Sequence, residues 1–319
     1  MPSKNISSDK KRTRWGEKPY YSLDYYLKNL YGHKVYKIAL EGGMTCPNRD
    51  GTLNSRGCIF CSNGGSGEFA ISEAAARSVF EQIEQAISFL TKNGKKTGNS
   101  YIAYFQSFSN TYAPVSRLRS LYMEAIAHPK VVGLAIGTRP DCFSDDIYDL
   151  ITECNQIKPT WIELGLQTMH EKTAQWMRRG YPLSVFEECV RKLRSRDISV
   201  VTHIILGLPY ETTQDILQTI AYLNSMDIQG IKLQLLHVLK DTDLAKLLPK
   251  IHIYSLEEYI DVLLQCIAHL SPDIVIHRLT GDGPKELLLA PMWSTHKRYV
   301  LNQIAHAMKT QNIYQGKEC

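Results

Sequence analysis

The sequence contains no long hydrophobic run. None of its 319 residues lies in an unbroken apolar stretch of the about 18 residues that a membrane helix requires, and residues 1–18 have no apolar segment that would serve as a signal peptide. Sequence repeats, low-complexity tracts and long linkers are also missing from the body of the chain. These absences predict a cytoplasmic protein without a membrane partner, built around one large core.

Cysteine is sparse, at eight residues, and most of it shows no paired spacing. Without a secretion signal, so few cysteines favour reduced thiols and a metal site over disulfides. Five of them are expected to be buried or incidental thiols rather than ligands of an auxiliary cluster. These five are Cys142, Cys154, Cys189, Cys266 and Cys319.

Charge is modest overall and unevenly placed. The hydrophobic content of 44% and charged content of 22% are ordinary for a globular protein, and the net charge is only +5. Residues 1–18 hold six basic and two acidic residues, among them Lys4, Lys10 and Lys11. This basic arm is consistent with phosphate binding and equally with a solvated terminus. Six tyrosines between residues 20 and 36 would stack on bases or pack on a helix.

Short apolar runs alternate with amphipathic stretches, which is typical of parallel βα units. Strands are expected near 34–41, 101–106, 131–137, 160–166, 199–206, 230–236 and 274–279. Helices are expected near 72–92, 115–127, 144–154, 171–178, 184–195 and 212–226.

Six strand–helix units predict an α/β fold with a partial (β/α)6 TIM-like barrel, in which chemistry lies at the carboxyl ends of the strands. We expect a basic, Tyr-rich N-terminal extension at 1–33, the barrel core at 34–245, and a C-terminal α/β capping and substrate region at 246–319.

Three cysteines follow the first predicted strand: Cys46, Cys58 and Cys61. Structural zinc and most electron-transfer clusters use four protein ligands, so three thiolates predict a metal centre with one open coordination position. The spacing also occurs in zinc ribbons and thioredoxin-like sites. The flanking glycines, at residues 42–43, 57, 64–65 and 67, favour an iron–sulfur cluster because they allow backbone amides to approach sulfur closely.

Further motifs recur at the strand ends, in the order in which they appear in one known family. They are Tyr104-Phe105-Gln106-Ser107, Thr138-Arg139-Pro140-Asp141, Glu163-Leu164-Gly165-Leu166-Gln167, Arg178-Arg179-Gly180 and Gly207-Leu208-Pro209-Tyr210-Glu211-Thr212. With the three cysteines, they resemble the radical S-adenosylmethionine (SAM) superfamily over about residues 34–280. The resemblance is closest to the branch of the Elongator catalytic subunit and the oxygen-independent coproporphyrinogen oxidases. Bacterial Elongator-like proteins carry the run found here at residues 43–51, Gly-Met-Thr-Cys-Pro-Asn-Arg-Asp-Gly.

This resemblance implies a 4Fe–4S cluster held by Cys46, Cys58 and Cys61, with SAM on the fourth iron. An electron donor such as ferredoxin or flavodoxin would then allow formation of a 5′-deoxyadenosyl radical. The relatives imply a tRNA substrate, and conversion of 5-carboxymethylaminomethyluridine to 5-aminomethyluridine at the wobble position.

The resemblance also implies residues that bind SAM. Gln106 replaces the Gly-Gly-Glu motif often found after the second strand and would accept from the SAM amino group. Gln167 would bind the ribose. Arg179 would pair with the SAM carboxylate, or the adjacent Arg178 would do so if the motif is aligned one residue earlier. His203 occupies a ribose-contact position or is a satisfied core residue, and Gly207 would bring backbone close to adenine.

Substrate candidates lie on the same barrel mouth. Arg139 would contact substrate or form an ion pair with Asp141. The other candidates are His237, Lys240, Arg278, Asp282 and Lys285.

Two alternatives to a tRNA-modifying enzyme stay open at this point. One is a radical SAM enzyme that acts on a small molecule such as a tetrapyrrole. The other is a non-catalytic zinc-bearing RNA-binding module.

Overall fold

The computed structural model describes residues 12–65, 78–95, 97–281 and 283–319. Several sequence predictions fall outside these residues: Lys4, Lys10 and Lys11 of the basic arm, Gly67, the predicted start of the first helix at residue 72, and Asp282. None of the described helices is both long enough and apolar enough to cross a membrane.

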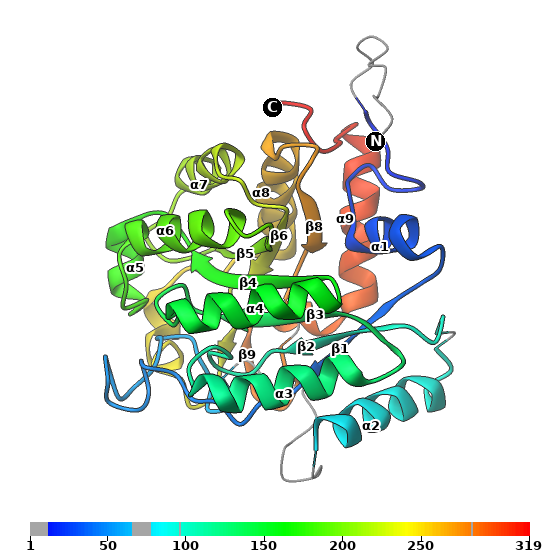
Figure 1. Cartoon of the computed structure of the whole chain (residues 1–319). Coiled ribbons are helices and arrows are strands. Elements are labelled where there is room, and N and C mark those ends of the chain that lie inside the picture. Colours follow the sequence, from blue (N-terminus) through cyan, green and yellow to red (C-terminus); the bar gives the residue numbers. More distant parts are fainter. Residues whose placement is uncertain (1–11, 66–77, 96, 282) are drawn as a thin grey trace.

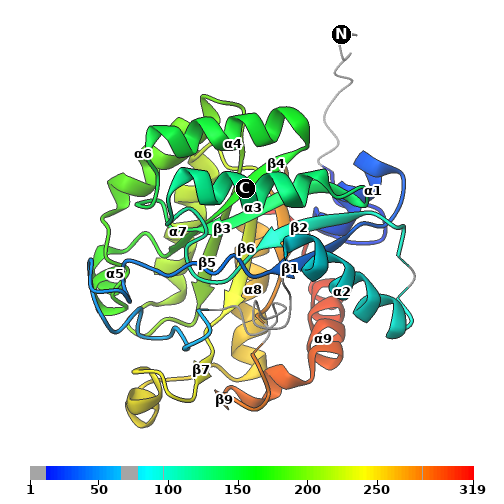
Figure 2. The same ribbon diagram turned by 60° about the horizontal axis from the view of Figure 1, so that its bottom comes forward.

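Seven parallel strands form one curved sheet in the order β1-β2-β3-β4-β5-β6-β8, with β1 and β8 at its two edges (Figures 1 and 2). The strands are β1 (Tyr36–Leu40), β2 (Tyr101–Phe105), β3 (Val131–Thr138), β4 (Thr160–Gln167), β5 (Ser199–Leu206), β6 (Gly230–Leu235) and β8 (Val275–Arg278). The sheet is a half-barrel, so the predicted α/β partial barrel is confirmed. All seven predicted strands are present.

Helices follow most strands and lie on the outside of the sheet (Figure 1). They are α2 (Val79–Lys92), α3 (Val115–Ala127), α4 (Asp145–Ile157), α5 (Glu171–Trp176), α6 (Leu183–Arg194) and α7 (Thr213–Ser225), followed by α8 (Leu256–His269) and α9 (Lys297–Thr310). Local sequence sets several starts. Ser78, Thr212 and Ser255 each cap a helix N-terminus with the side-chain oxygen.

The core between sheet and helices is large and apolar. β2 is buried at every position, as expected for a parallel strand covered on both faces. A second, smaller cluster fills the barrel interior, where Ile102, Ala135 and Val201 meet Leu27 of α1 (Leu23–Tyr31). α1 therefore covers the amino end of the barrel, and the carboxyl end stays available for chemistry.

The N-terminal segment and the end of the chain meet at the edge strand β8. Ser22 pairs with Ile276, and Gln315 accepts from the Tyr21 backbone N–H at 2.8 Å. The Tyr31 hydroxyl donates to the Val132 carbonyl at 2.9 Å. These contacts favour a packed helix as the reason for several of the N-terminal tyrosines.

Three features were not predicted. The sequence reasoning did not place α1, nor the small antiparallel pair β7 (Val238–Leu239) and β9 (Leu288–Ala290), which lies apart from the main sheet (Figure 2). Two 3₁₀ turns, η2 (Ala245–Lys250) and η3 (Met292–Thr295), accompany that pair. The division at 33/34 and 245/246 stays a prediction, and β8 shows that the last segment contributes a strand to the same sheet.

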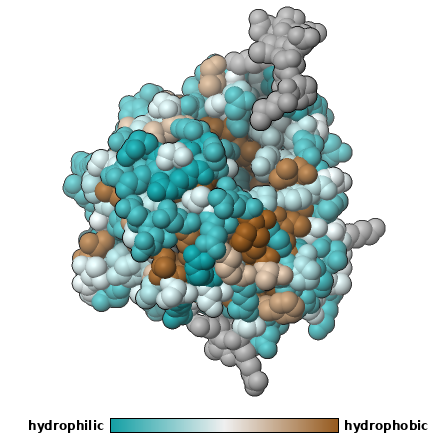
Figure 3. All heavy atoms as spheres, viewed as in Figure 1, coloured by the Kyte–Doolittle hydropathy of each residue, from teal (hydrophilic) through white to brown (hydrophobic). Residues whose placement is uncertain are grey.

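Hydrophilic side chains predominate on the face seen in Figure 3, with hydrophobic groups scattered among them.

Candidate active site

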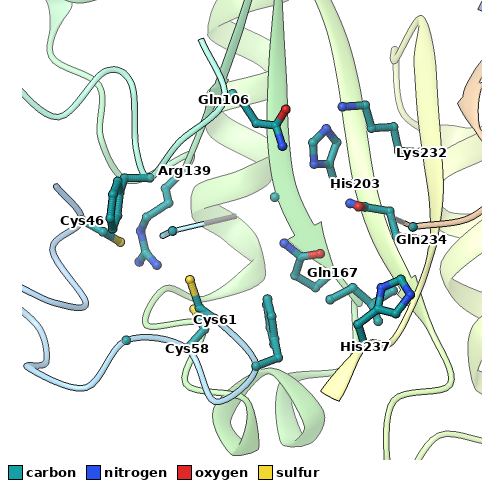
Figure 4. A pocket seen from close by; sticks show the side chains of 18 of the residues that line it. Cys46, Cys58, Cys61, Gln106, Arg139, Gln167, His203, Lys232, Gln234 and His237 are labelled. Carbon is teal, nitrogen blue, oxygen red and sulfur yellow. The ribbon is translucent and has the colours of Figure 1, made fainter. Parts of the chain in front are cut away.

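One pocket lies at the carboxyl ends of the strands and receives side chains from several of them. All three motif cysteines line it, together with Gln106, Arg139, Gln167, Arg179, His203, His237 and Arg278. In Figure 4, Cys46, Cys58 and Cys61 lie at one side of the pocket, Lys232 and His237 lie at the other, and Gln167 lies between them. The topology thus brings together most of the residues that the motifs predicted.

The cysteine loop is organised by two neighbours of Cys46. The buried Asn48 amide donates to the Arg178 carbonyl at 2.7 Å and to Cys58 Sγ at 3.4 Å. The Arg49 guanidinium donates to the carbonyl of Cys61 at 2.8 Å. Gly57 has a φ of 74°, and a Cβ there would lie 3.1 Å from Arg49 Nε. Glycine is therefore required for the loop to close around this guanidinium.

The cysteine sulfurs lie in an environment that favours neutral thiols unless positive charge is supplied. Burial raises the pKa of Cys58, which Arg139 opposes, and burial also raises the pKa of Cys61 to about 11. A bound cationic metal centre would supply that charge.

A single metal ion does not fit the three cysteines well. Within the described part of the chain, no group of three or more His, Cys, Asp or Glu side chains is arranged to hold one ion. A zinc site needs its ligands to converge on one point. In a cubic cluster each thiolate binds a different iron, so three separated sulfurs around one pocket are the expected arrangement.

Arg139 and Asp141 form a two-point ion pair. Arg139 Nε and Nη2 donate to the two carboxylate oxygens at 2.9 and 2.7 Å. The guanidinium carbon also lies 5.2 Å from the ring centre of Tyr181. Arg139 lines the pocket on the side of the cysteines (Figure 4), so Asp141 holds the guanidinium in place while its positive charge acts on Cys58.

Gln167 ends β4 in a left-handed conformation, with a φ of 68°. The register between β4 and β5 shifts between Gly165 and Gln167, which turns this last residue toward the pocket. Its side-chain Oε1 is buried without a hydrogen-bond partner. Buried acceptors are almost always satisfied, so this orphaned oxygen fits a ligand donor such as a ribose hydroxyl.

Arg179 lies in the pocket wall but is largely engaged by the protein. Its guanidinium donates to the carbonyls of Leu166, Thr168 and Tyr181, and to Glu171 Oε1 at 2.9 Å. These bonds use four of its five N–H donors. Arg178, the alternative carboxylate partner, bonds Asp243 at 2.6 Å instead.

His203 and Gly207 lie on and just after β5. His203 lines the pocket and contacts Glu163 Oε2 at 2.9 Å. Gly207 has a φ of 85°, and a Cβ there would lie 3.1 Å from the Tyr254 ring. The turn after β5 is therefore tight enough to require glycine.

The substrate candidates divide into two groups. His237 and Arg278 line the pocket, and His237 Nε2 lies 3.1 Å from Ser294 Oγ. Lys240 and Lys285 are exposed and lie outside the pocket wall. The Lys240 backbone N–H donates to the Leu287 carbonyl at 2.7 Å, next to the β7–β9 pair. The unpredicted β7–β9 pair holds this segment: Leu239 of β7 lines the pocket, and the exposed Lys240 follows it outside the wall.

Sequence reasoning missed a buried charge network in the barrel interior. The fully buried carboxylate of Glu163 accepts from Lys37, Lys232 and His203, and from Trp161 Nε1 at 3.0 Å. Although burial opposes ionisation, Lys232 and Lys37 hold the pKa of Glu163 well below its usual value. The sequence did contain an indication of this network: Lys37, Glu163 and Lys232 each lie within a largely apolar strand. Charged residues are rarely buried in such strands unless they are paired.

The fold and the pocket define a half-barrel enzyme with its site at the carboxyl ends of parallel strands. The model of the Radical SAM superfamily matches residues 53–223, and that of the Radical SAM C-terminal domain matches residues 228–310. The chain belongs to the radical SAM superfamily. Cys58 and Cys61 lie inside the first matched range, and Cys46 lies shortly before it.

Two curated relatives match nearly end to end. "Uncharacterized protein YtqA" of Bacillus subtilis is 43% identical over 94% of this chain and 93% of its own length. "Protein YhcC" of Escherichia coli is 36% identical over 85% of this chain and 86% of its own length. The archaeal Methanocaldococcus infernus Elp3 structure superposes with a TM-score of 0.66 at 15% identity, over 88% of this chain and 64% of that one. This last likeness shows the fold alone.

The superfamily assignment confirms the predicted class and its cofactors. The protein is a radical SAM enzyme that uses a 4Fe–4S cluster and SAM and requires a reductant. The zinc-bearing, non-catalytic hypothesis is not compatible with that assignment.

Proposed function

We propose that this radical SAM enzyme modifies the wobble uridine of tRNA, converting the 5-carboxymethylaminomethyl group to 5-aminomethyl. The run at residues 43–51 supports this proposal through its resemblance to bacterial Elongator-like proteins. The observation that carries it is the charge of the pocket. Five cationic side chains, Arg49, Arg139, Arg179, Lys232 and Arg278, line it against one lining carboxylate, Glu163, among the described residues. Asp141 and Glu171, which do not line the pocket, pair with Arg139 and Arg179. Such a wall favours ligands that bear carboxylates.

We propose that Cys46, Cys58 and Cys61 hold the cluster. Asn48 and Arg49 position the loop, and the Asn48 amide donates a hydrogen bond to Cys58 Sγ. Hydrogen bonds to sulfur and excluded solvent are levers by which a protein tunes such a cluster. When bound, the reduced cluster and SAM supply a 5′-deoxyadenosyl radical that removes hydrogen from an unactivated carbon.

The SAM contacts follow from the neighbouring wall. The orphaned Gln167 oxygen would accept from the ribose, and the pocket-lining Gln106 would accept from the amino group. The turn at Gly207 would bring backbone close to the adenine. Arg179 acts mainly as a positioning residue that fixes the end of β4 through the Leu166 and Thr168 carbonyls. His203 stays neutral and orients Glu163.

The substrate side chain enters the part of the pocket opposite the cysteines. His237 and Lys232 lie in this part (Figure 4), and Arg278 lines the same pocket. The C-terminal region 246–319 contributes Arg278, Gly281 and Gly283 to the pocket wall and would contact the rest of the tRNA. The substrate must lie close to the adenosyl group while water is excluded.

The experiment is mass analysis of tRNA nucleosides from a strain that lacks the gene. We expect 5-carboxymethylaminomethyluridine to accumulate, and purified protein with SAM and reductant to convert it in vitro. An unchanged nucleoside profile would contradict the proposal and favour the small-molecule alternative, such as a tetrapyrrole.

The basic arm can be tested separately. Trp15 is 2% exposed, so a deletion through residue 18 would remove a buried side chain as well as charge. A deletion that ends at residue 11 removes a net charge of +2 and leaves Trp15 in place. Weaker tRNA binding with a lower salt dependence would support a phosphate contact, and unchanged affinity would contradict it.

A further inference from the structure

The charge network around Glu163 leaves positive charge in excess inside the barrel. Lys37 and Lys232 share this one carboxylate, and their side chains are 18% and 8% exposed. Arg278 lines the same space. Buried cations are costly unless an anion neutralises them, and among the described residues of this network one carboxylate serves both lysines.

The two lysines have different surroundings. Lys37 Nζ lies 3.7 Å from the ring centre of Tyr104 and 5.4 Å from that of Trp161, so aromatic faces cover it. Lys232 donates to Glu163 and to the Tyr104 hydroxyl at 3.2 Å. An ammonium has three donors, so one N–H of Lys232 is available for a ligand.

Lys232 is also accessible from two directions. It lines the pocket of the cysteines, and it lines a second pocket that opens between α2 and β8. Tyr104, Gln106 and Arg278 line both pockets as well. Lys37 lines only the second. The second pocket has apolar walls from Leu23 and Phe89.

We propose that Lys232, together with Arg278, forms the subsite that binds the carboxylate of the substrate. Glu163 and Tyr104 position the Lys232 ammonium. The inference rests on the proposed function and deepens it: the glycine-derived carboxylate of the 5-carboxymethylaminomethyl group is the anion that this subsite selects. In Figure 4, Lys232 lies across the pocket from Cys58 and Cys61, so a substrate held by its acid extends its methylene back toward the cysteines.

The lowered pKa of Lys232 agrees with a role in carboxylate binding. Burial, together with the nearby charges of Lys37 and Arg278, lowers its pKa to about 7 despite the attraction of Glu163. A bound carboxylate opposes that shift and keeps the ammonium charged.

The test compares three variants, Lys232→Met, Lys232→Arg and Lys37→Met. The last is a matched control, because it also removes one lysine from Glu163 but does not line the cysteine pocket. Each variant is assayed with tRNA that carries 5-carboxymethylaminomethyluridine and with the same tRNA after conversion of that carboxylate to a carboxamide. SAM cleavage without tRNA is measured in parallel.

We expect wild type and Lys37→Met to prefer the acid over the amide on the order of 10- to 100-fold in kcat/KM, as for one charge-assisted contact. Lys232→Met should lose this preference and Lys232→Arg should keep most of it. A Lys232→Met enzyme that still prefers the acid overturns the subsite alone. Wild-type enzyme that cleaves SAM but converts neither tRNA overturns the proposed function and the subsite together.

Discussion

His203 Nε2 lies 2.9 Å from Glu163 Oε2 in the barrel interior. This bond joins neighbouring strands β5 and β4, and it fixes the tautomer in which Nε2 carries the proton, because the carboxylate can only accept. Burial, followed by the positive charge of Lys232, lowers the pKa of His203 to about 4. The imidazole is therefore neutral at pH 7.

Stability should fall in acid because of this histidine. Between pH 6.5 and pH 4 the unfolded chain binds a proton that folded His203 does not, so the free energy of unfolding decreases as the pH is lowered through this window. Wild type should lose up to about 3 kcal/mol more than His203→Gln between pH 7 and pH 4. Denaturant unfolding at both pH values measures this difference, and equal losses in the two proteins would contradict it.

Glu163→Gln should be strongly destabilising. The substitution keeps the shape of the side chain but leaves Lys37 and Lys232 without their shared carboxylate, a change that costs about 3–5 kcal/mol for buried pairs. The control is Glu153→Gln, which removes a solvent-exposed partner of Arg119 and should change stability little, because exposed ion pairs contribute little. Urea denaturation compares the two, and similar small losses would show that Glu163 is dispensable for folding.

Gln167→Asn should weaken SAM binding about tenfold, the effect of one lost hydrogen bond to a buried acceptor. Asparagine tolerates the left-handed backbone at this position and withdraws the amide by one methylene. Gln175→Asn, on the exposed surface of α5, is the matched control. Calorimetric titration of cluster-loaded protein with SAM gives the dissociation constants. Equal affinity in both variants would remove Gln167 from the SAM site.

Cys58→Ala should abolish SAM cleavage and lower the iron content of anaerobically reconstituted protein. A cluster with only two of its thiolates is not retained in the form that leaves one iron open to SAM. Cys319→Ser changes an exposed cysteine far from the pocket and should behave like wild type. Full cleavage by Cys58→Ala would mean that the ligands are wrongly assigned.

The fold was predictable because its signals are local. Runs such as Val131–Thr138 are apolar and bounded by turn residues, and α2 and α7 have capping side chains at their starts. The cysteine loop was also predictable, because its three thiols lie within 16 consecutive residues. Their common pocket follows from one topological rule about strand ends.

The charge network was not predictable in the same way. Lys37, Glu163 and Lys232 lie on β1, β4 and β6 and are separated by 126 and 69 residues. Their meeting depends on strand register and on which face each side chain occupies, and a shift by one residue reverses that face. Lys240 follows β6 closely in the sequence, yet it lies outside the pocket wall, and the segment before it pairs as β7 with β9 from a distant part of the chain.

The two edges of the sheet, β1 and β8, are not paired with each other among the described strands. In a closed barrel, strand number and stagger together fix the diameter. An arc has no such constraint, so a small change in its curvature widens or narrows the gap beside Lys37 and Arg278 without breaking a ladder hydrogen bond. With the same strand pairing, the sheet can therefore open at this gap for a large substrate and then narrow around the side chain that reacts.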